Sequence, residues 1–125
     1  AKDVVAVALN KKRKETTELR NLDKVRVCFT LRENPIASAG NKVVYLRVVR
    51  PDQLVITPSP DNLFEVKGEQ LIFSANRAVD YANTDIEMCI FLDNTGDFIT
   101  GTYDVELYLD GEKIGTGAFS LKGKG

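Results

Sequence analysis

Three short segments of the sequence hold residue types that bind anions or metal ions. Gly115 and Gly117 have the spacing that opens a phosphate-binding loop, residues 93–97 concentrate side-chain oxygens suited to Ca²⁺, and residues 11–14 form a basic run. Each lacks the rest of its motif: Ser120 stands at the third glycine position, the acidic turn has no terminal glutamate, and no aromatic residue interrupts the basic run. We therefore predict a strand, a turn and a solvated loop, with no cofactor and no metal.

The sequence contains no histidine and no tryptophan. The commonest general base is therefore missing, and Ser-His-Asp triads, Cys-His pairs and histidine-ligated metal sites are excluded for this chain. Carboxylates are plentiful, but no pair of them can be singled out as general acid and base without a cleft. We expect no enzymatic activity and no small-molecule substrate.

Charge is distributed unevenly along the 125 residues. The net charge is −1, which is not the basic bias of a nucleic-acid-binding domain, so we expect no nucleic-acid partner. Residues 1–50 nevertheless carry a net charge of +7 and residues 51–125 a net charge of −8. Strands from both halves can interleave and cancel this field. Alternatively, the folded chain is dipolar and associates with itself or with a charged partner.

Strand patterns recur along the whole chain, and no segment of about ten residues shows helical periodicity. No run approaches the ~20 apolar residues that cross a bilayer, so we expect a soluble domain with no membrane span. Turns are expected at residues 33–35 and 39–41, prolines place residues 54–56 at a sheet edge, and residues 76–83 are ambiguous. The predicted strands are residues 3–9, 25–31, 42–50, 54–56, 63–66, 70–74, 86–92, 103–109 and 113–122.

This spacing of short strands predicts an all-β fold, an immunoglobulin-like antiparallel β-sandwich of about seven to nine strands, with residues 1–125 forming one domain. Tyr103 has the position of a tyrosine corner, in which the hydroxyl bonds back to the backbone. Val105 stands where antibody domains have a cysteine, so their inter-sheet disulfide is not expected. Asp110-Gly111 is a hairpin-turn signal, and a change of phase near Gly115 suits a β-bulge.

Two cysteines, Cys28 and Cys89, are too few for a disulfide framework. Both fall on the outward phase of their predicted strands, residues 25–31 and 86–92. If these strands are neighbours in one sheet, the two side chains lie within reach of each other. They are then either two free thiols or a cross-strand disulfide formed in an oxidising compartment.

The strand at residues 42–50 offers a candidate interaction face. Val44, Leu46 and Val48 would face the core, and Tyr108 on the strand at residues 103–109 takes the outward phase. Tyr and Arg are enriched at binding hot spots, so this face could capture a protein. Alternatively, loops of the domain itself cover it. The outward residues of the 42–50 strand are Val43, Tyr45, Arg47 and Val49.

The sequence resembles the C-terminal β-sandwich of bacterial envelope proteins that carry an N-terminal membrane anchor and a long coiled coil. Such proteins are often labelled as chromosome-partitioning or segregation proteins. The resemblance covers nearly the whole chain, and Cys89 matches the second cysteine of those domains. It implies no catalytic residues. The segments that carry it are residues 27–30, 33–37, 44–52, 87–90, 101–105 and 110–119.

These observations predict a non-enzymatic protein-interaction or structural domain. From the resemblance, we expect it to be the terminal module of a longer protein of the periplasm or cell envelope, with a protein partner. Two alternatives remain: a carbohydrate-binding module, which would need aromatic platforms, and a nucleic-acid accessory domain that uses the basic N-terminal half.

Overall fold

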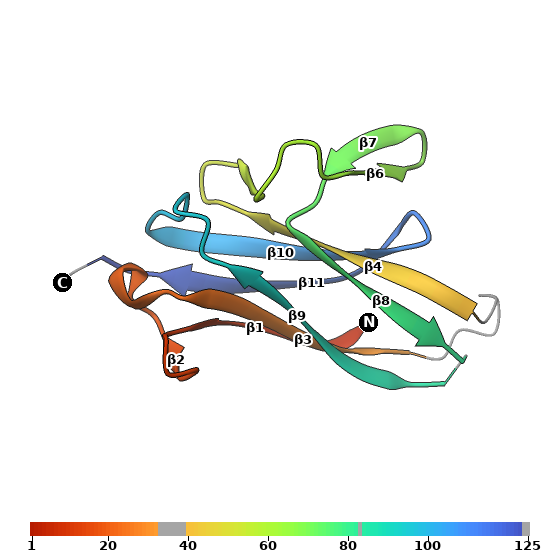
Figure 1. Cartoon of the computed structure of the whole chain (residues 1–125), viewed down its shortest axis with the longest axis horizontal. Coiled ribbons are helices and arrows are strands. Elements are labelled where there is room, and N and C mark those ends of the chain that lie inside the picture. Colours follow the sequence, from red (N-terminus) through yellow and green to blue (C-terminus); the bar gives the residue numbers. More distant parts are fainter. Residues whose placement is uncertain (33–39, 83, 124–125) are drawn as a thin grey trace.

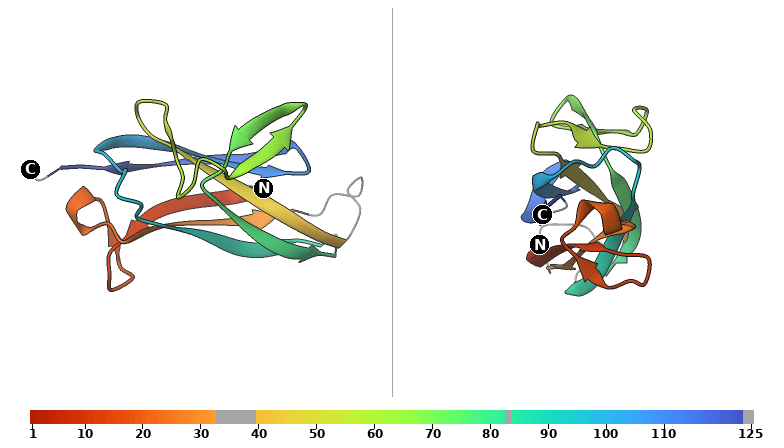
Figure 2. Two further views of the ribbon diagram at one scale, coloured as in Figure 1. Left: turned by 45° about the horizontal axis from the view of Figure 1, so that its top comes forward. Right: turned by 90° about the vertical axis from the view of Figure 1, so that its left-hand side faces the viewer.

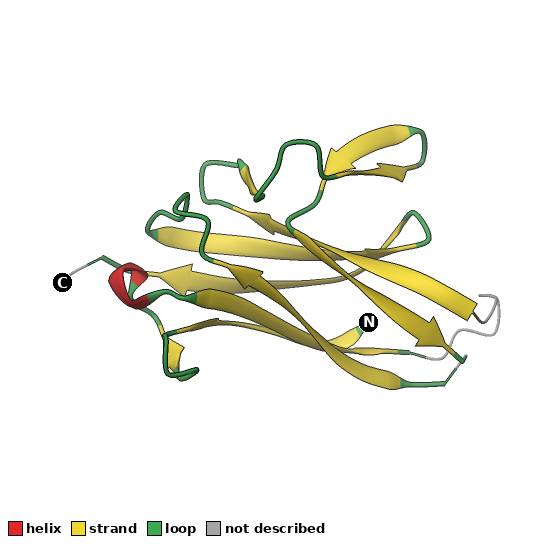
Figure 3. Ribbon diagram, in the orientation of Figure 1, coloured by secondary structure: helices red, strands yellow, loops and turns green. Residues whose placement is uncertain are grey.

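The computed structural model describes residues 1–32, 40–82 and 84–123. The predicted turn at residues 33–35 lies outside the described residues, as do residue 39 of the second turn and residue 83 of the ambiguous segment. Figure 3 shows that strands dominate; the helical element within the described residues is a 3₁₀ turn, η1 (Leu19–Asn21). The strands are β1 (Lys2–Leu9), β2 (Glu15–Thr16), β3 (Lys24–Leu31), β4 (Gly40–Val49), β5 (Val55–Ile56), β6 (Leu63–Val66), β7 (Glu69–Ile72), β8 (Ala75–Tyr81), β9 (Ile86–Asp93), β10 (Gly101–Leu109) and β11 (Glu112–Leu121).

The strands form antiparallel sheets, as the sequence predicts. A four-stranded sheet has the order β2-β1-β3-β9, and a five-stranded sheet has the order β11-β10-β4-β5 with β8 also paired to β4. β6 and β7 form a separate hairpin. Figures 1 and 2 show the hairpin above the five-stranded sheet and the four-stranded sheet below it. The expected pairing of the strands at 25–31 and 86–92 is confirmed, since β3 pairs with β9.

The hydrophobic core lies between the two sheets and is built mainly by alternating residues of each strand. Val25 and Val27 of β3 are fully buried, as are Val44 and Leu46 of β4 and Val105 of β10. β-branched residues favour strands because their side chains pack well on a pleated surface. All five belong to one cluster of buried residues that draws on both sheets. The predicted inward phase of residues 25–31 and 42–50 is therefore confirmed.

Two strand assignments differ from the prediction. The ambiguous segment at 76–83 contains β8, which pairs along β4 from Gly40 opposite Tyr81 to Leu46 opposite Ala75. Gly40 therefore begins a strand where a turn was predicted. β2 was not predicted because it has only two residues inside a charged connection. β8 and β5 lie along the same edge of β4, and the Ser74 hydroxyl accepts a hydrogen bond from Val48 N–H at 2.8 Å between them.

The C-terminal hairpin agrees with the sequence in detail. Asp110 and Gly111 both have positive φ, 51° and 76°, as a two-residue type I′ turn requires. Pairing runs from Leu107 opposite Gly115 to Tyr108 opposite Lys113, so one extra residue forms a β-bulge on β11. The bulge is where the predicted change of phase falls.

Gly115 and Gly117 serve packing in this structure. A Cβ atom at either position would lie 3.1 Å from a methyl group of Val4 on β1. The absence of side chains lets β1 approach β11 closely. The spaced glycines are therefore explained by strand contact, and a strand follows them as predicted.

The tyrosine-corner hydrogen bond is present. The Tyr103 hydroxyl donates to the Ile99 carbonyl at 2.7 Å and accepts from Ile99 N–H at 2.6 Å. Burial of the phenol raises the pKa of Tyr103, while the bond from the Ile99 backbone opposes that rise. The side chain is fully buried, so the loop before β10 is tied to the core by one hydroxyl.

We expect Tyr103→Phe to lower the free energy of unfolding by about 1–2 kcal/mol, because it leaves the Ile99 backbone without its partner. Urea denaturation measures the loss. Tyr45→Phe is the matched control, since the Tyr45 hydroxyl has no hydrogen bond to any residue that the structure describes, and it should change stability by less than about 0.5 kcal/mol. Equal effects of the two substitutions would contradict the role of the corner.

Candidate functional site

The interaction face predicted on β4 and β10 is not an open surface. The β6–β7 hairpin folds over it, and Phe64 of β6 stacks on Tyr45 with ring centroids 4.5 Å apart. Phe64 also contacts Tyr108 edge-on at 5.3 Å, and Phe73 packs against Tyr45 at 5.0 Å. Tyr108 is consequently only 6% exposed. For Tyr45 and Tyr108 the structure therefore shows the alternative that the sequence left open, in which the domain itself covers the face.

Arg47 of β4 links the β6–β7 hairpin to the five-stranded sheet. Its Nε donates to the Ile72 carbonyl at 2.9 Å, and its Nη1 pairs with Glu106 Oε1 at 2.8 Å. Of the remaining predicted residues, Val43 is exposed and Val49 is half-buried. Five residues on adjacent strands are therefore outward as predicted, but three of them lie beneath the hairpin or bond to it.

The Glu106 carboxylate of β10 accepts hydrogen bonds from three side chains near the β6–β7 hairpin. Arg47, Tyr108 and Lys113 all donate to its carboxylate, at 2.8, 3.2 and 3.2 Å. Burial acts to raise the pKa of Glu106, but the hydrogen bond and charge of Lys113, with the charge of Arg47, lower it overall. The same carboxylate raises the pKa of Lys113. This is a structural ion-pair network.

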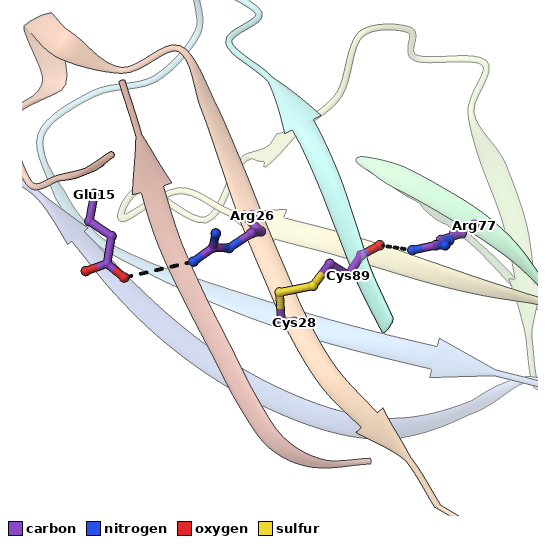
Figure 4. The surroundings of a disulfide bond; sticks show 5 residues. All are labelled: Glu15, Arg26, Cys28, Arg77 and Cys89. Carbon is purple, nitrogen blue, oxygen red and sulfur yellow. Dashed lines mark hydrogen bonds and ion pairs between the residues drawn. A yellow bond between two sulfur atoms is a disulfide. The ribbon is translucent and has the colours of Figure 1, made fainter. Parts of the chain in front are cut away.

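Cys28 and Cys89 form a disulfide, which resolves the two alternatives left by the sequence. They are directly opposed on β3 and β9, with a Cα–Cα distance of 4.0 Å, and both are half-buried on the outer face of the four-stranded sheet. Figure 4 shows the bridge, with Arg77 of β8 donating to the Cys89 carbonyl at 2.8 Å. The bridge joins neighbouring strands of one sheet. The inter-sheet cross-link of antibody domains is absent, as predicted.

The outer face of the four-stranded sheet is the exposed strand surface that sequence analysis missed. The register places Val5 of β1 in one row with the disulfide, and Val7, Arg26 and Phe91 in the next row. Val5 is 53% exposed and Phe91 is 51% exposed. No hairpin of the described chain covers these two side chains. We call Val5, Val7, Phe91 and the disulfide the open face.

A small basic groove lies at one end of the open face. It has a volume of about 410 Å³ and contains the side chains of Leu9, Arg13, Lys24, Arg26 and Phe91. Its residues come from β1, β3, β9 and the loop that follows β1. The basic run at residues 11–14 is exposed, as predicted for a solvated loop, but it contributes Arg13 to this groove.

A larger groove of about 750 Å³ runs on the other side of Phe91. Its walls are polar and come from the segment before β6, the start of β8 and the predicted turn at residues 93–97. Within that turn Thr95 donates to Asp97 and Asn94 accepts from Gly96 N–H, so its oxygens are used in local turn bonds. Among the described residues, no cluster of acidic or sulfur ligands has the arrangement of a metal site.

The sequence matches one known protein family over almost its whole length. A family described as "Domain of unknown function (DUF8428)" matches residues 2–122. The chain belongs to this family. The DUF8428 match begins at the first residue of β1 and ends just after β11, so it includes every strand of both sheets. No curated protein and no solved structure matches the chain. Among the described residues of this DUF8428 domain, no helix is long and apolar enough to cross a membrane.

We expect the double substitution of Cys28 and Cys89 by serine to lower the free energy of unfolding by about 2–4 kcal/mol, since the bridge closes a long loop between residues separated by 61 positions. Urea denaturation measures the change. Chemical reduction of the wild-type protein is the control: it should add the mass of two hydrogen atoms and reproduce the stability of the variant. A variant as stable as the oxidised protein would contradict this expectation.

The stability contributed by Glu106 should depend on pH. Its pKa is lower in the folded chain than the ordinary value of 4.5, so its stabilisation is present above that value and is lost as pH falls through the folded pKa. We expect Glu106→Gln to cost about 1 kcal/mol near pH 7 and progressively less as the pH falls below the ordinary value through the lowered pKa of Glu106. Glu112→Gln is the control, because the Glu112–Lys67 pair at 3.7 Å is exposed. A cost of Glu106→Gln that is constant with pH would contradict the prediction.

Proposed function

We propose that this DUF8428 domain is an immunoglobulin-like β-sandwich that serves as a non-enzymatic protein-interaction domain. The sandwich assignment is supported by two antiparallel sheets with a shared core and by the Tyr103 hydrogen bonds to Ile99. The interaction role rests on one observation, the exposure of Val5 and Phe91 on a single strand surface.

The open face has the composition of a binding surface. Exposed large apolar side chains that stand together on one surface commonly mark contacts with other proteins. Here Val5 and Phe91 flank the disulfide, and Arg26 lies between Val7 and Phe91 in the register. Aromatic and arginine side chains are the types most enriched at interface hot spots. The face is also built on paired strands, so a partner need not order a loop to bind it.

The disulfide supports an extracytoplasmic setting. Disulfides persist in oxidising compartments such as the bacterial periplasm and are rare in the cytosol. The resemblance to the terminal β-sandwich of membrane-anchored coiled-coil envelope proteins agrees with that setting. We propose that the domain is the terminal module of a longer protein of the periplasm or cell envelope and that it contacts a protein partner there.

Glycan binding is less well supported by the geometry. The larger groove has polar walls, but of its two aromatic side chains Phe73 is packed edge-on against Tyr45 and Phe64. Phe91 is then the ring left to stack on a sugar. A carbohydrate-binding module needs exposed aromatic platforms, so the groove favours protein contact over sugar contact.

We expect the double substitution of Val5 and Phe91 by serine to reduce partner capture from an extract of the source cells at least about tenfold, because it removes the apolar centre of the open face. The retained proteins are identified by mass spectrometry. Leu54→Ser is the matched control, since Leu54 is 57% exposed outside the open face, and it should capture as the wild type does. Both variants should melt within a few degrees of the wild type. Equal capture by the two variants would rule out the open face as the interaction surface.

A further inference from the structure

The structure also indicates the chemistry of the partner. Resting on the proposed interaction function, we propose that the basic groove at the end of the open face binds an acidic segment of a partner protein that carries an apolar residue. The groove is defined by Leu9, Arg13, Lys24, Arg26 and Phe91. Three features support this assignment: the positive charge of the groove, the unpartnered Nε of Arg26, and the apolar side chains of Leu9 and Phe91.

The groove is strongly cationic. Three of its five lining residues are Arg or Lys, and no carboxylate of the described chain lines it. The nearest ion pairs are long: Arg26 Nη2 to Glu15 Oε1 is 3.9 Å, and Lys24 Nζ to Asp23 Oδ2 is 3.7 Å. Pairs of this kind between partly exposed groups contribute little to stability. The cations are therefore held together without close neutralisation.

Arg26 carries unused hydrogen-bonding capacity. Its Nε is buried and has no hydrogen-bond partner in the described structure. Figure 4 shows the guanidinium directed toward Glu15, the loose partner at 3.9 Å. A buried donor without a partner is uncommon in folded proteins and calls for an explanation. A guanidinium presents its donors in a planar fork that matches a carboxylate, so an acidic side chain of a ligand can replace Glu15.

The groove also has an apolar component, which separates it from a simple phosphate site. Leu9 is almost completely buried at its base, and the half-exposed ring of Phe91 forms a wall. Its volume of about 410 Å³ accommodates a few side chains. An apolar or aromatic residue can pack between Leu9 and Phe91 while flanking carboxylates reach the cations. This combination of contacts selects an acidic, partly apolar peptide.

The test uses three capped hexapeptides, EDFLDE, EDSSDE and KKFLKK, titrated by NMR into the isotope-labelled, disulfide-bonded protein. We expect EDFLDE to shift the amide signals of Lys24, Arg26 and Phe91, and to bind at least tenfold more tightly than either other peptide. Raising the salt from about 20 mM to about 300 mM should weaken EDFLDE binding several-fold, because the groove is partly exposed.

Variants separate the contributions to the groove. Arg26→Gln should weaken EDFLDE binding at least tenfold, and Glu15→Gln should strengthen it two- to threefold by removing the competing carboxylate. Lys67→Gln is the charge control, since the Lys67 side chain is 73% exposed on the β6–β7 turn, and it should have no effect. Equal effects of Arg26→Gln and Lys67→Gln would overturn the proposal. So would the absence of shifts at about 1 mM EDFLDE.

Two further outcomes distinguish other ligands and the underlying function. Tighter binding of a short oligothymidylate, or of vesicles rich in phosphatidylglycerol, than of EDFLDE would show a general polyanion surface and overturn the peptide assignment. In the capture experiment, a loss with the Val5 and Phe91 double variant that Arg26→Gln does not reproduce would overturn the acidic-segment inference alone. Capture that survives both changes would overturn the proposed interaction surface together with the inference.

Discussion

Successive side chains of a β-strand point to opposite faces of the sheet, and in this chain that constraint decides which side chains are accessible from solvent. On β3, β4, β9 and β10 one face is committed to the shared core, where side chains such as Val27, Leu46 and Val105 are fully buried. Fully burying one such side chain contributes about 1.5–3 kcal/mol, so neither sheet can expose its inner face to a ligand. The surfaces that remain accessible from solvent are the outer faces, the sheet edges and the loops.

The outer faces of the two sheets differ in how far the rest of the described chain covers them. The β6–β7 hairpin covers the five-stranded sheet, with Phe64 stacked on Tyr45 and Arg47 bonded to the Ile72 carbonyl. The outer face of the four-stranded sheet keeps Val5 and Phe91 half-exposed. Tyr45, Tyr108 and Arg47, whose residue types suggested a binding surface, instead contact the β6–β7 hairpin of the same domain. The exposed strand surface that we propose for interaction therefore lies on the opposite side of the molecule from the face predicted from the sequence.

Local periodicity could predict the strands, their inward residues and the outward phase of Cys28 and Cys89, because alternation is a property of each strand alone. That the two cysteines lie within reach of each other followed only on the further assumption that their strands are neighbours, which the pairing of β3 with β9 confirms. It could not place the β6–β7 hairpin, although both of its strands were predicted correctly. Where a hairpin docks depends on contacts between distant segments, such as Tyr45 with Phe64. The basic groove could not be predicted for the same reason, because strand pairing is what brings Phe91 of β9 near Arg13 of the basic run at residues 11–14.

The position of the disulfide follows from this division between a covered and an open sheet. No hairpin of the described chain is laid over the open face, so packing of that kind does not stabilise it. A covalent bridge between adjacent strands stabilises it while occupying little of its surface, and Cys28 and Cys89 supply that bridge from the outward side of β3 and β9. At the edge of β9, Arg77 satisfies the Cys89 carbonyl, a group that an edge strand would otherwise expose. The open face is thus cross-linked by bonds in its own plane, and a surface that is ordered before binding loses less conformational entropy on association.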